Sequence, residues 1–326
     1  MTSEPQKVKM RIMSILTLKT VIFLCASISF MDFILQSYAV VISAPTEQSK
    51  RIVCYYTFPT KTYNLKPQDI DSKMCTHIIV GFVTLDNGSI DIDQNQKKTI
   101  EEVIRLKKKN TNLKVMLSIG GGGGQYGFPE MVNSSMNRNR LVDFVNLMSY
   151  DYNFYSILTP WTGMNAPLYA RSKDFFYFKT QNINYTSNYW LRKGMAKEKI
   201  NIGLPVYAHT YKLASPNKTY LGAPSVGDGV LGGGGSAKYG TICEFMQIQS
   251  LSPVFDEETK SPYVTNGSEW VSFENEESMK YKAQFVRDNG FGGVMVFSLN
   301  SDDYDGTCET NNKFPNTKMI HRIFVE

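Results

Sequence analysis

The chain of 326 residues lacks several features that would place it in common functional classes. The apolar run at 21–31 is well short of the ~20 residues that a membrane-spanning helix needs. No pair of cysteines has the spacing of a zinc site. The glycine run at 120–124 is not followed by Gly-Lys-Ser or Gly-Lys-Thr, so it does not match a phosphate-binding loop. We therefore expect no metal and no cofactor.

Charge is also sparse and unclustered. The formal net charge is +5, and the basic residues are dispersed along the chain. The clearest basic run, Lys107-Lys108-Lys109, ends a segment with helical spacing and is interpreted as a solvated helix end. We expect no nucleic-acid partner.

The N-terminal 44 residues have the order of a secretory signal, a basic flank followed by a short apolar run. Asp32 interrupts the apolar residues, and Ser37-Tyr38-Ala39 offers a small-x-small cleavage site. Residues 1–44 are therefore predicted to be a signal peptide, which makes the protein secreted and extracellular. The alternative is an uncleaved signal anchor that holds the protein at a membrane.

Short apolar runs that end in small or polar residues predict buried parallel strands. These runs lie at 51–57, 75–83, 113–119, 144–150, 199–207 and 292–299. Helical spacing predicts helices at 93–109, 128–141, 185–196 and 274–289, with Gly290 as a C-terminal cap. Asn87-Gly88 predicts a turn. Strands that alternate with helices indicate an α/β barrel.

Residues 211–272 differ from the rest of the chain. They contain clusters of glycine and proline, including a second glycine run at 232–235, and few periodic apolar positions. We interpret this stretch as a small α+β insertion.

Five motifs in combination resemble glycoside hydrolase family 18, the chitinases and chitinase-like lectins. They are Cys54-Tyr55, Ser118-Ile119-Gly120-Gly121, Met148-Ser149-Tyr150-Asp151, Gly203-Leu204-Pro205-Val206-Tyr207 and Gly292-Gly293-Val294-Met295-Val296. The resemblance covers the chain from Arg51 to the C-terminus. It implies that residues 45–326 form a catalytic-type TIM barrel domain. That barrel is incomplete, because about six of the family's eight strands can be found.

The family's catalytic motif is absent. In the family the fourth strand ends in Asp-x-x-Asp-x-Asp-x-Glu, whose glutamate is the general acid. Only residues 122–143 separate the third predicted strand from the run that matches the family's sixth, and the motif does not occur in the chain. Other carboxylates, at 69–71, 91–93 and 302–305, are interpreted as solvated loop residues. Asp302, Asp303 and Asp305 follow the last predicted strand and are expected to cap or hold the loop there. No catalytic residue is assigned, so activity is uncertain and leans towards none.

Part of a sugar-binding floor remains. Tyr150 and Asp151 match the family's Met-x-Tyr-Asp, where both side chains contact the substrate. Tyr55 and Tyr207 fall at strand ends that face the groove, and aromatic rings suit pyranose faces. Phe297 stands where the family has a tryptophan platform. The resemblance therefore implies these five residues as substrate-binding residues.

One further position departs from the family. His209 stands where an arginine often follows the seventh strand, and it is expected to be mostly uncharged near neutral pH. This change weakens the implied site.

Five cysteines are present, and Cys25 lies in the signal segment. The other four allow three pairings, among which composition cannot choose. The family resemblance implies Cys54–Cys75 and Cys243–Cys308. Reduced thiols are less expected after export to an oxidising compartment. Sites for N-glycosylation occur at Asn87, Asn133, Asn184, Asn217 and Asn266.

These observations predict a secreted, monomeric chitinase-like glycoprotein. It binds chitin or related N-acetylglucosamine oligosaccharides, without hydrolysis. The alternative is a truncated isoform or gene model of an active chitinase, which is non-functional or unstable as written. A working chitinase with a relocated acid has no supporting residue.

Overall fold

The computed structural model describes residues 50–86, 89–119, 121 and 143–325. The predicted signal segment, the turn at Asn87-Gly88 and the helix at 128–141 lie outside these residues. Within them, no helix is long and apolar enough to cross a membrane.

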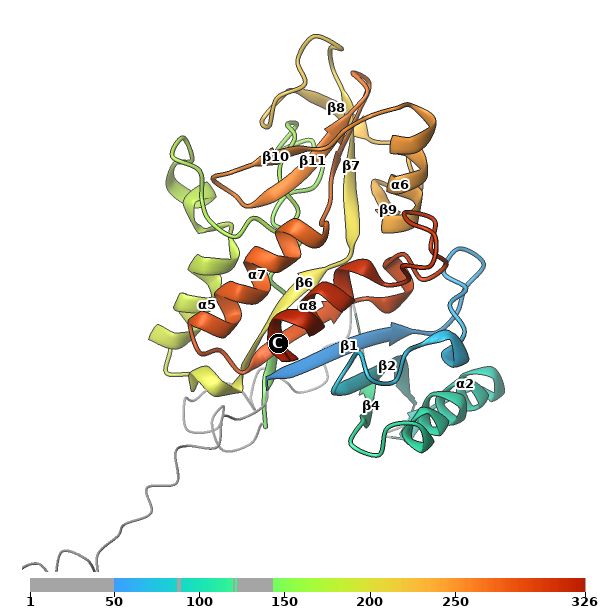
Figure 1. Ribbon diagram of the computed structural model, residues 1–326. Coiled ribbons are helices and arrows are strands. Elements are labelled where there is room, and N and C mark those ends of the chain that lie inside the picture. The colour runs from blue at the N-terminus through green and yellow to red at the C-terminus, as the bar shows by residue number, and fades with distance from the viewer. Residues whose placement is uncertain (1–49, 87–88, 120, 122–142, 326) are drawn as a thin grey trace, which may run out of the picture. The chain divides into compact units, whose positions relative to one another are not determined.

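The first sheet is a curled half-barrel of six parallel strands, in the spatial order β4-β2-β1-β13-β6-β5 (Figure 1). The strands are β1 (Arg51–Thr57), β2 (His77–Asp86), β4 (Lys114–Ile119), β5 (Val145–Leu147), β6 (Ile200–Pro205) and β13 (Gly293–Phe297). A short strand, β3 (Ser89–Asp91), pairs antiparallel to β2. Every residue of β6 is buried, as expected for a parallel strand covered on both faces. The predicted incomplete TIM-type barrel is thus confirmed.

The half-barrel has two ends. β4 pairs with β2, β5 pairs with β6, and within the described residues no ladder joins β4 to β5. β5 is also shorter than the predicted strand at 144–150. The backbone turns after Leu147, where the Ser149 N–H donates to Leu147 O, and Asp151 has a left-handed φ of 58°.

Helices precede or follow the barrel strands, and α8 (Pro315–Val325) comes after the last of them. The other α-helices of this part are α2 (Gln94–Arg105), α5 (Ile183–Arg192) and α7 (Glu276–Asp288). Short 3₁₀ helices lie at Pro67–Asp69, Leu106–Lys108, Phe176–Thr180, Lys197–Lys199 and Leu299–Ser301. Asp93 begins α2 and Asn275 begins α7, each in a capping box that satisfies first-turn N–H groups. Gly290 follows α7 with a φ of 72°, as predicted for its cap.

A second sheet is inserted after β6. Its strands are β7 (Tyr207–Leu213), β8 (Ser225–Asp228), β9 (Ser236–Lys238), β10 (Val254–Asp256), β11 (Ser261–Thr265) and β12 (Glu269–Ser272), with helix α6 (Tyr239–Ile248). The order is β10-β11-β12-β7-β8, and β9 also pairs with β7. β6 continues through Val206 into β7, so one extended stretch runs from the first sheet into the second (Figure 1). Tyr207 therefore lies at the junction of the two sheets.

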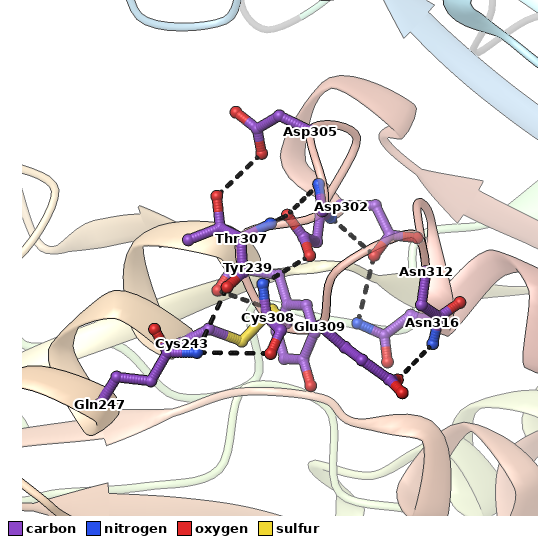
Figure 2. The surroundings of a disulfide bond; sticks show 12 residues. Tyr239, Cys243, Gln247, Asp302, Asp305, Thr307, Cys308, Glu309, Asn312 and Asn316 are labelled. Carbon is purple, nitrogen blue, oxygen red and sulfur yellow. Dashed lines mark hydrogen bonds between the residues drawn. A yellow bond between two sulfur atoms is a disulfide. The ribbon is translucent and has the colours of Figure 1, made fainter.

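Both implied disulfides are present, Cys54–Cys75 and Cys243–Cys308. Cys54–Cys75 links β1 to the segment that leads into β2. Cys243 lies on α6 and Cys308 in the loop after β13, so the second bridge ties the insertion to the barrel (Figure 2).

Asp302 and Asp303 hold the loop after β13, as expected from the sequence, but they are not solvated, whereas Asp305 is exposed. Asp302 and Asp303 are buried, and they hold the loop and the start of α8. Asp302 Oδ2 accepts from Thr317 N–H and Oγ1, and Asp303 accepts backbone N–H groups of the loop, including that of Cys308. Burial raises the pKa of Asp302 to about 6. These carboxylates are structural and lie beside the disulfide.

A buried ion pair joins the insertion to the helical layer. Lys282 on α7 donates to both carboxylate oxygens of Glu274 and, over 3.0 Å, to Ser261 Oγ on β11. Both charged side chains are almost fully inaccessible. Burial raises the pKa of Glu274 and lowers that of Lys282, and the mutual attraction of the charges opposes both shifts.

Candidate functional site

Aromatic rings gather at the carboxyl ends of the barrel strands, where functional residues of such barrels lie. Phe297, the last residue of β13, is their centre. Its ring centroid lies 5.5 Å from that of Tyr55, 5.9 Å from Tyr150 and 6.3 Å from Tyr207. Phe82 on β2 lies 5.9 Å from Tyr55. We refer to these five residues, Tyr55, Phe82, Tyr150, Tyr207 and Phe297, as the aromatic floor.

The structure thus brings together the four aromatic residues implied from the sequence. Phe82 is an addition that the sequence analysis missed. It lies in the second half of β2, beside Tyr55 on β1, and strand-end position was the signal that could have found it.

Gly203 allows the chain that carries Tyr150 to approach β6. A Cβ atom at this position would lie 2.1 Å from Leu147 O and 2.9 Å from Tyr150 Cε1. Any larger residue would therefore push β5 and Tyr150 away from β6. The glycine of the Gly-Leu-Pro-Val-Tyr motif thus sets the position of the Tyr150 ring on the floor.

Asp151 stands at the edge of the aromatic floor and is the centre of its polar contacts. Its Oδ1 accepts hydrogen bonds from Tyr207 Oη and from His209 Nε2, the latter over 2.7 Å. Its backbone N–H donates to Asn165 Oδ1 over 2.8 Å. Buried Asn165 also donates from Nδ2 to Tyr207 O. Asn165 therefore holds the backbones of Asp151 and Tyr207, the two residues that the Tyr207 Oη–Asp151 Oδ1 hydrogen bond joins.

His209 stands where the family often has an arginine, and it contacts the edge of the aromatic floor. Its imidazole Nε2 hydrogen-bonds to the Asp151 carboxylate. The other ring nitrogen, Nδ1, faces Gly235 O at 3.3 Å, and the ring of Phe154 lies 6.0 Å away. The contact could not be found from the sequence, because 58 residues separate Asp151 from His209.

The ionisation of these groups follows from their surroundings. Burial acts to raise the pKa of Asp151, but the hydrogen bonds from His209 and Tyr207 outweigh it and the pKa is lowered. Burial raises the pKa of Tyr150 and of Tyr207 well above its ordinary value. At neutral pH the site therefore presents an anionic carboxylate and neutral phenols. About half of the Asp151 side chain is exposed (48%), so it can accept hydrogen bonds from a ligand.

This arrangement can bind a sugar, but it is poorly suited to general acid catalysis. A general acid must hold a proton near the working pH, and Asp151 is shifted in the opposite direction. Among the described residues, no group of three or more His, Cys, Asp or Glu side chains is placed to hold a metal ion.

Known proteins are similar to this chain in sequence. Human chitinase-3-like protein 2 is 26% identical over 361 aligned positions, which cover 83% of this chain and 92% of that protein. Mouse chitotriosidase-1 is also 26% identical, with 83% and 77% covered. The alignment of 361 positions is longer than the 326 residues of this chain, so the relative has residues without a counterpart here.

Solved structures of chitinases and of a chitinase-like protein are similar to this fold. An immunomodulatory active chitinase from Trichuris suis superposes with a TM-score of 0.75 at 25% identity, covering 84% of this chain and 99% of that one. Human YKL-39, described as a pseudo-chitinase with retained chitooligosaccharide binding, also gives 0.75 at 25% identity, covering 85% and 100%. The family model "Glycosyl hydrolases family 18" matches residues 51–143 and 138–302. The chain therefore belongs to glycosyl hydrolase family 18.

Proposed function

We propose that this protein binds chitin oligosaccharides on the aromatic floor and does not hydrolyse them. The observation that carries the proposal is the anionic Asp151, held by Tyr207 and His209 at the edge of the floor. The rings offer apolar faces for pyranose stacking, and the carboxylate offers an acceptor for the N–H or O–H groups of an N-acetylglucosamine unit.

The lack of hydrolysis is supported by the chain itself. The sequence holds no Asp-x-x-Asp-x-Asp-x-Glu. The two family-model matches meet at residues 138–143, between β4 and β5, where the family's fourth and fifth strands are expected. The chain thus retains the binding floor and loses the proton donor. YKL-39 is a precedent for binding without activity within the family.

The test of binding is calorimetric titration of the purified protein with chitotetraose, and with cellotetraose as a ligand that lacks acetamido groups. We expect chitotetraose to bind and cellotetraose to bind about tenfold more weakly or not at all. Phe297→Ala removes the central ring and lowers the affinity. Tyr189→Ala, which removes an exposed ring on α5, is the matched control and leaves the affinity unchanged. Equal affinity for both sugars rejects the proposal.

Export is part of the same proposal. The basic flank and apolar run at the N-terminus, together with two disulfides, support a secreted, extracellular protein. We expect a soluble monomer cleaved near Ala39 or Ala44. N-terminal sequencing of the secreted product tests this, and an intact Met1 on a membrane-bound product supports the signal anchor instead.

Glycosylation of the exported chain is also proposed. Asn217 is exposed in a turn, which suits a glycan. The side chain of Asn266, by contrast, is engaged by Gln249 and Ser268. Treatment with a glycosidase that removes N-glycans, followed by mass spectrometry, should show that a larger fraction of Asn217 than of Asn266 carried a glycan.

A second candidate is a shortened product of a gene that also encodes an active chitinase. It is favoured by the contiguous position of the missing motif, because a decaying barrel would show scattered changes instead. Long-read transcripts test it directly. An in-frame insert between Arg140 and Val142 that encodes Asp-x-x-Asp-x-Asp-x-Glu supports this origin, and a genome without such an insert rejects it.

A further inference from the structure

A hollow of about 380 Å³ lies away from the aromatic floor, between the loops that precede α5 and the second sheet. Its walls include Trp161, Met164, Pro167, Arg171, Phe178 and Leu221. No residue of the aromatic floor contributes to it. Ligand pockets generally range from roughly 300 to 1,000 Å³, so this one suits a small molecule.

The apolar part of the hollow is built from aromatic rings. The centroids of Trp161 and Phe178 lie 6.0 Å apart in an edge-to-face arrangement. The ring of Phe175 lies 5.7 Å from that of Phe178 and is 62% exposed. Trp161 is itself 38% exposed, although its backbone forms an isolated bridge to Pro224, just before β8. Flat apolar surface therefore remains available, which favours a ligand with a planar ring.

Arg171 supplies the polar part. Its Nη1 donates to Leu221 O over 3.3 Å, whereas its Nε is buried and has no hydrogen-bond partner among the described residues. A buried donor without a partner destabilises the folded chain, and the cost is larger when the group is charged. A ligand oxygen at this nitrogen would remove that cost.

The charged side chains that line the hollow carry a net positive charge. Arg171 and Lys173 line it, and Asp174 is the one carboxylate among its described lining residues. Asp174 already accepts the Arg171 backbone N–H over 2.8 Å. Glu258 lies nearby and accepts the Ser172 backbone N–H. Neither carboxylate forms an ion pair with Arg171 or Lys173 among the described residues.

We propose that this hollow is a second ligand site, which binds a small molecule that has a planar apolar ring and a carboxylate. The ring lies against Trp161 and Phe178, and the carboxylate accepts hydrogen bonds from the guanidinium of Arg171, with Lys173 at the entrance. A guanidinium matches a carboxylate well, because its N–H groups are charged and lie in a fixed plane. The site is independent of the proposed chitin binding.

The probe is 2-naphthoate, with 2-naphthalenemethanol as its neutral counterpart, titrated into the full chain by calorimetry. We expect the carboxylate to bind about tenfold more tightly than the alcohol. Arg171→Gln should abolish that difference and leave the affinity for the alcohol unchanged. Trp161→Ala should weaken both ligands about equally. Equal affinities for the two ligands in the native chain overturn the proposal.

Two controls make the result specific. If Arg171→Gln lowers the thermal midpoint, Lys173→Gln replaces it, because Lys173 is exposed and its loss should weaken naphthoate about two- to threefold without affecting the fold. Naphthoate should also bind equally well in saturating chitotetraose. Displacement by chitotetraose would place the ligand on the aromatic floor and overturn the proposal. Failure of chitotetraose binding alone would reject the proposed function and not this site.

Discussion

Asp151 Oδ1 lies 2.7 Å from His209 Nε2, although 58 residues separate the two positions. Asp151 follows β5 of the barrel, and His209 lies on β7 of the second sheet. The contact therefore couples the barrel to the insertion at the point where Tyr207 also donates to Asp151. It keeps the carboxylate anionic, which suits hydrogen bonding to a sugar and opposes proton donation.

The Asp151–His209 contact makes a direct prediction for binding. Asp151→Asn and His209→Phe should each weaken chitotetraose binding about tenfold, or about 1.4 kcal/mol. The double variant should lose less than the sum, because each single change already breaks the shared contact. His209→Arg is the matched control, since it keeps a donor for Asp151 and should retain most of the affinity. Calorimetric titration of the native chain and these four variants measures the losses in affinity. Strictly additive losses in the double variant would contradict the prediction.

His77 predicts the pH dependence of stability. Burial, with Lys114 and Arg51 nearby, lowers its pKa from 6.5 to about 4. The unfolded chain then binds a proton before the folded chain does, so stability is lost as pH falls from about 6.5 to 4. The whole shift is worth roughly 3 kcal/mol at most. His77→Gln should flatten the decline.

The measurement is urea unfolding at intervals between pH 4.5 and 7.5. His321→Gln, which removes the histidine of α8, serves as the control for loss of an imidazole. Parallel pH profiles for the native chain and His77→Gln would show that His77 does not carry the effect.

Lys282 and Glu274 predict a strong coupling in stability. Lys282→Met leaves a buried carboxylate without its partner and should cost about 3–5 kcal/mol. The double change Lys282→Met with Glu274→Leu removes both charges and should recover part of this loss. Denaturant unfolding of Lys282→Met, Glu274→Leu and the double variant gives the comparison. A double variant as unstable as the sum of the two single variants would rule out the coupling.

The ends of the half-barrel predict marginal stability. Among the residues that the structure describes, β4 and β5 each have one paired neighbour in the parallel sheet. Met116 on β4 and Met148 just after β5 are largely exposed, at 40% and 75%. Unpaired strand edges with apolar neighbours promote association. We expect a low thermal midpoint and loss of monomer on storage, measured by calorimetry and size-exclusion chromatography. A sharp transition at high temperature in a stably monomeric sample is the opposite result.

The sequence predicted the elements whose signals are local. The six parallel strands were recognisable as short apolar runs, and α7 was recognisable from its spacing and from Gly290. The strand at β5 was predicted too long, because a run of apolar residues does not show where the backbone turns. The disulfides were predicted only through the family resemblance, since four cysteines allow three pairings.

Features that depend on contacts between residues far apart in the sequence could not be predicted from it. Asp302 and Asp303 were expected to hold their loop, but their burial was not predicted, because it follows from the docking of α8 and the Cys243–Cys308 bridge. Phe82 and the partnership of His209 with Asp151 required the strands to be placed side by side. The hollow beside Trp161 likewise exists only after the loops pack on the second sheet.

Binding without hydrolysis is tested by analysing the products that form when the protein is saturated with chitotetraose. Chitotetraose is incubated with the purified protein at a concentration at which calorimetry shows saturation, and the products are separated by chromatography and mass spectrometry. We expect saturable binding, and we expect the amount of intact chitotetraose after incubation to equal that in a buffer control. Release of chitobiose or chitotriose above that control, abolished in Asp151→Asn, would contradict it.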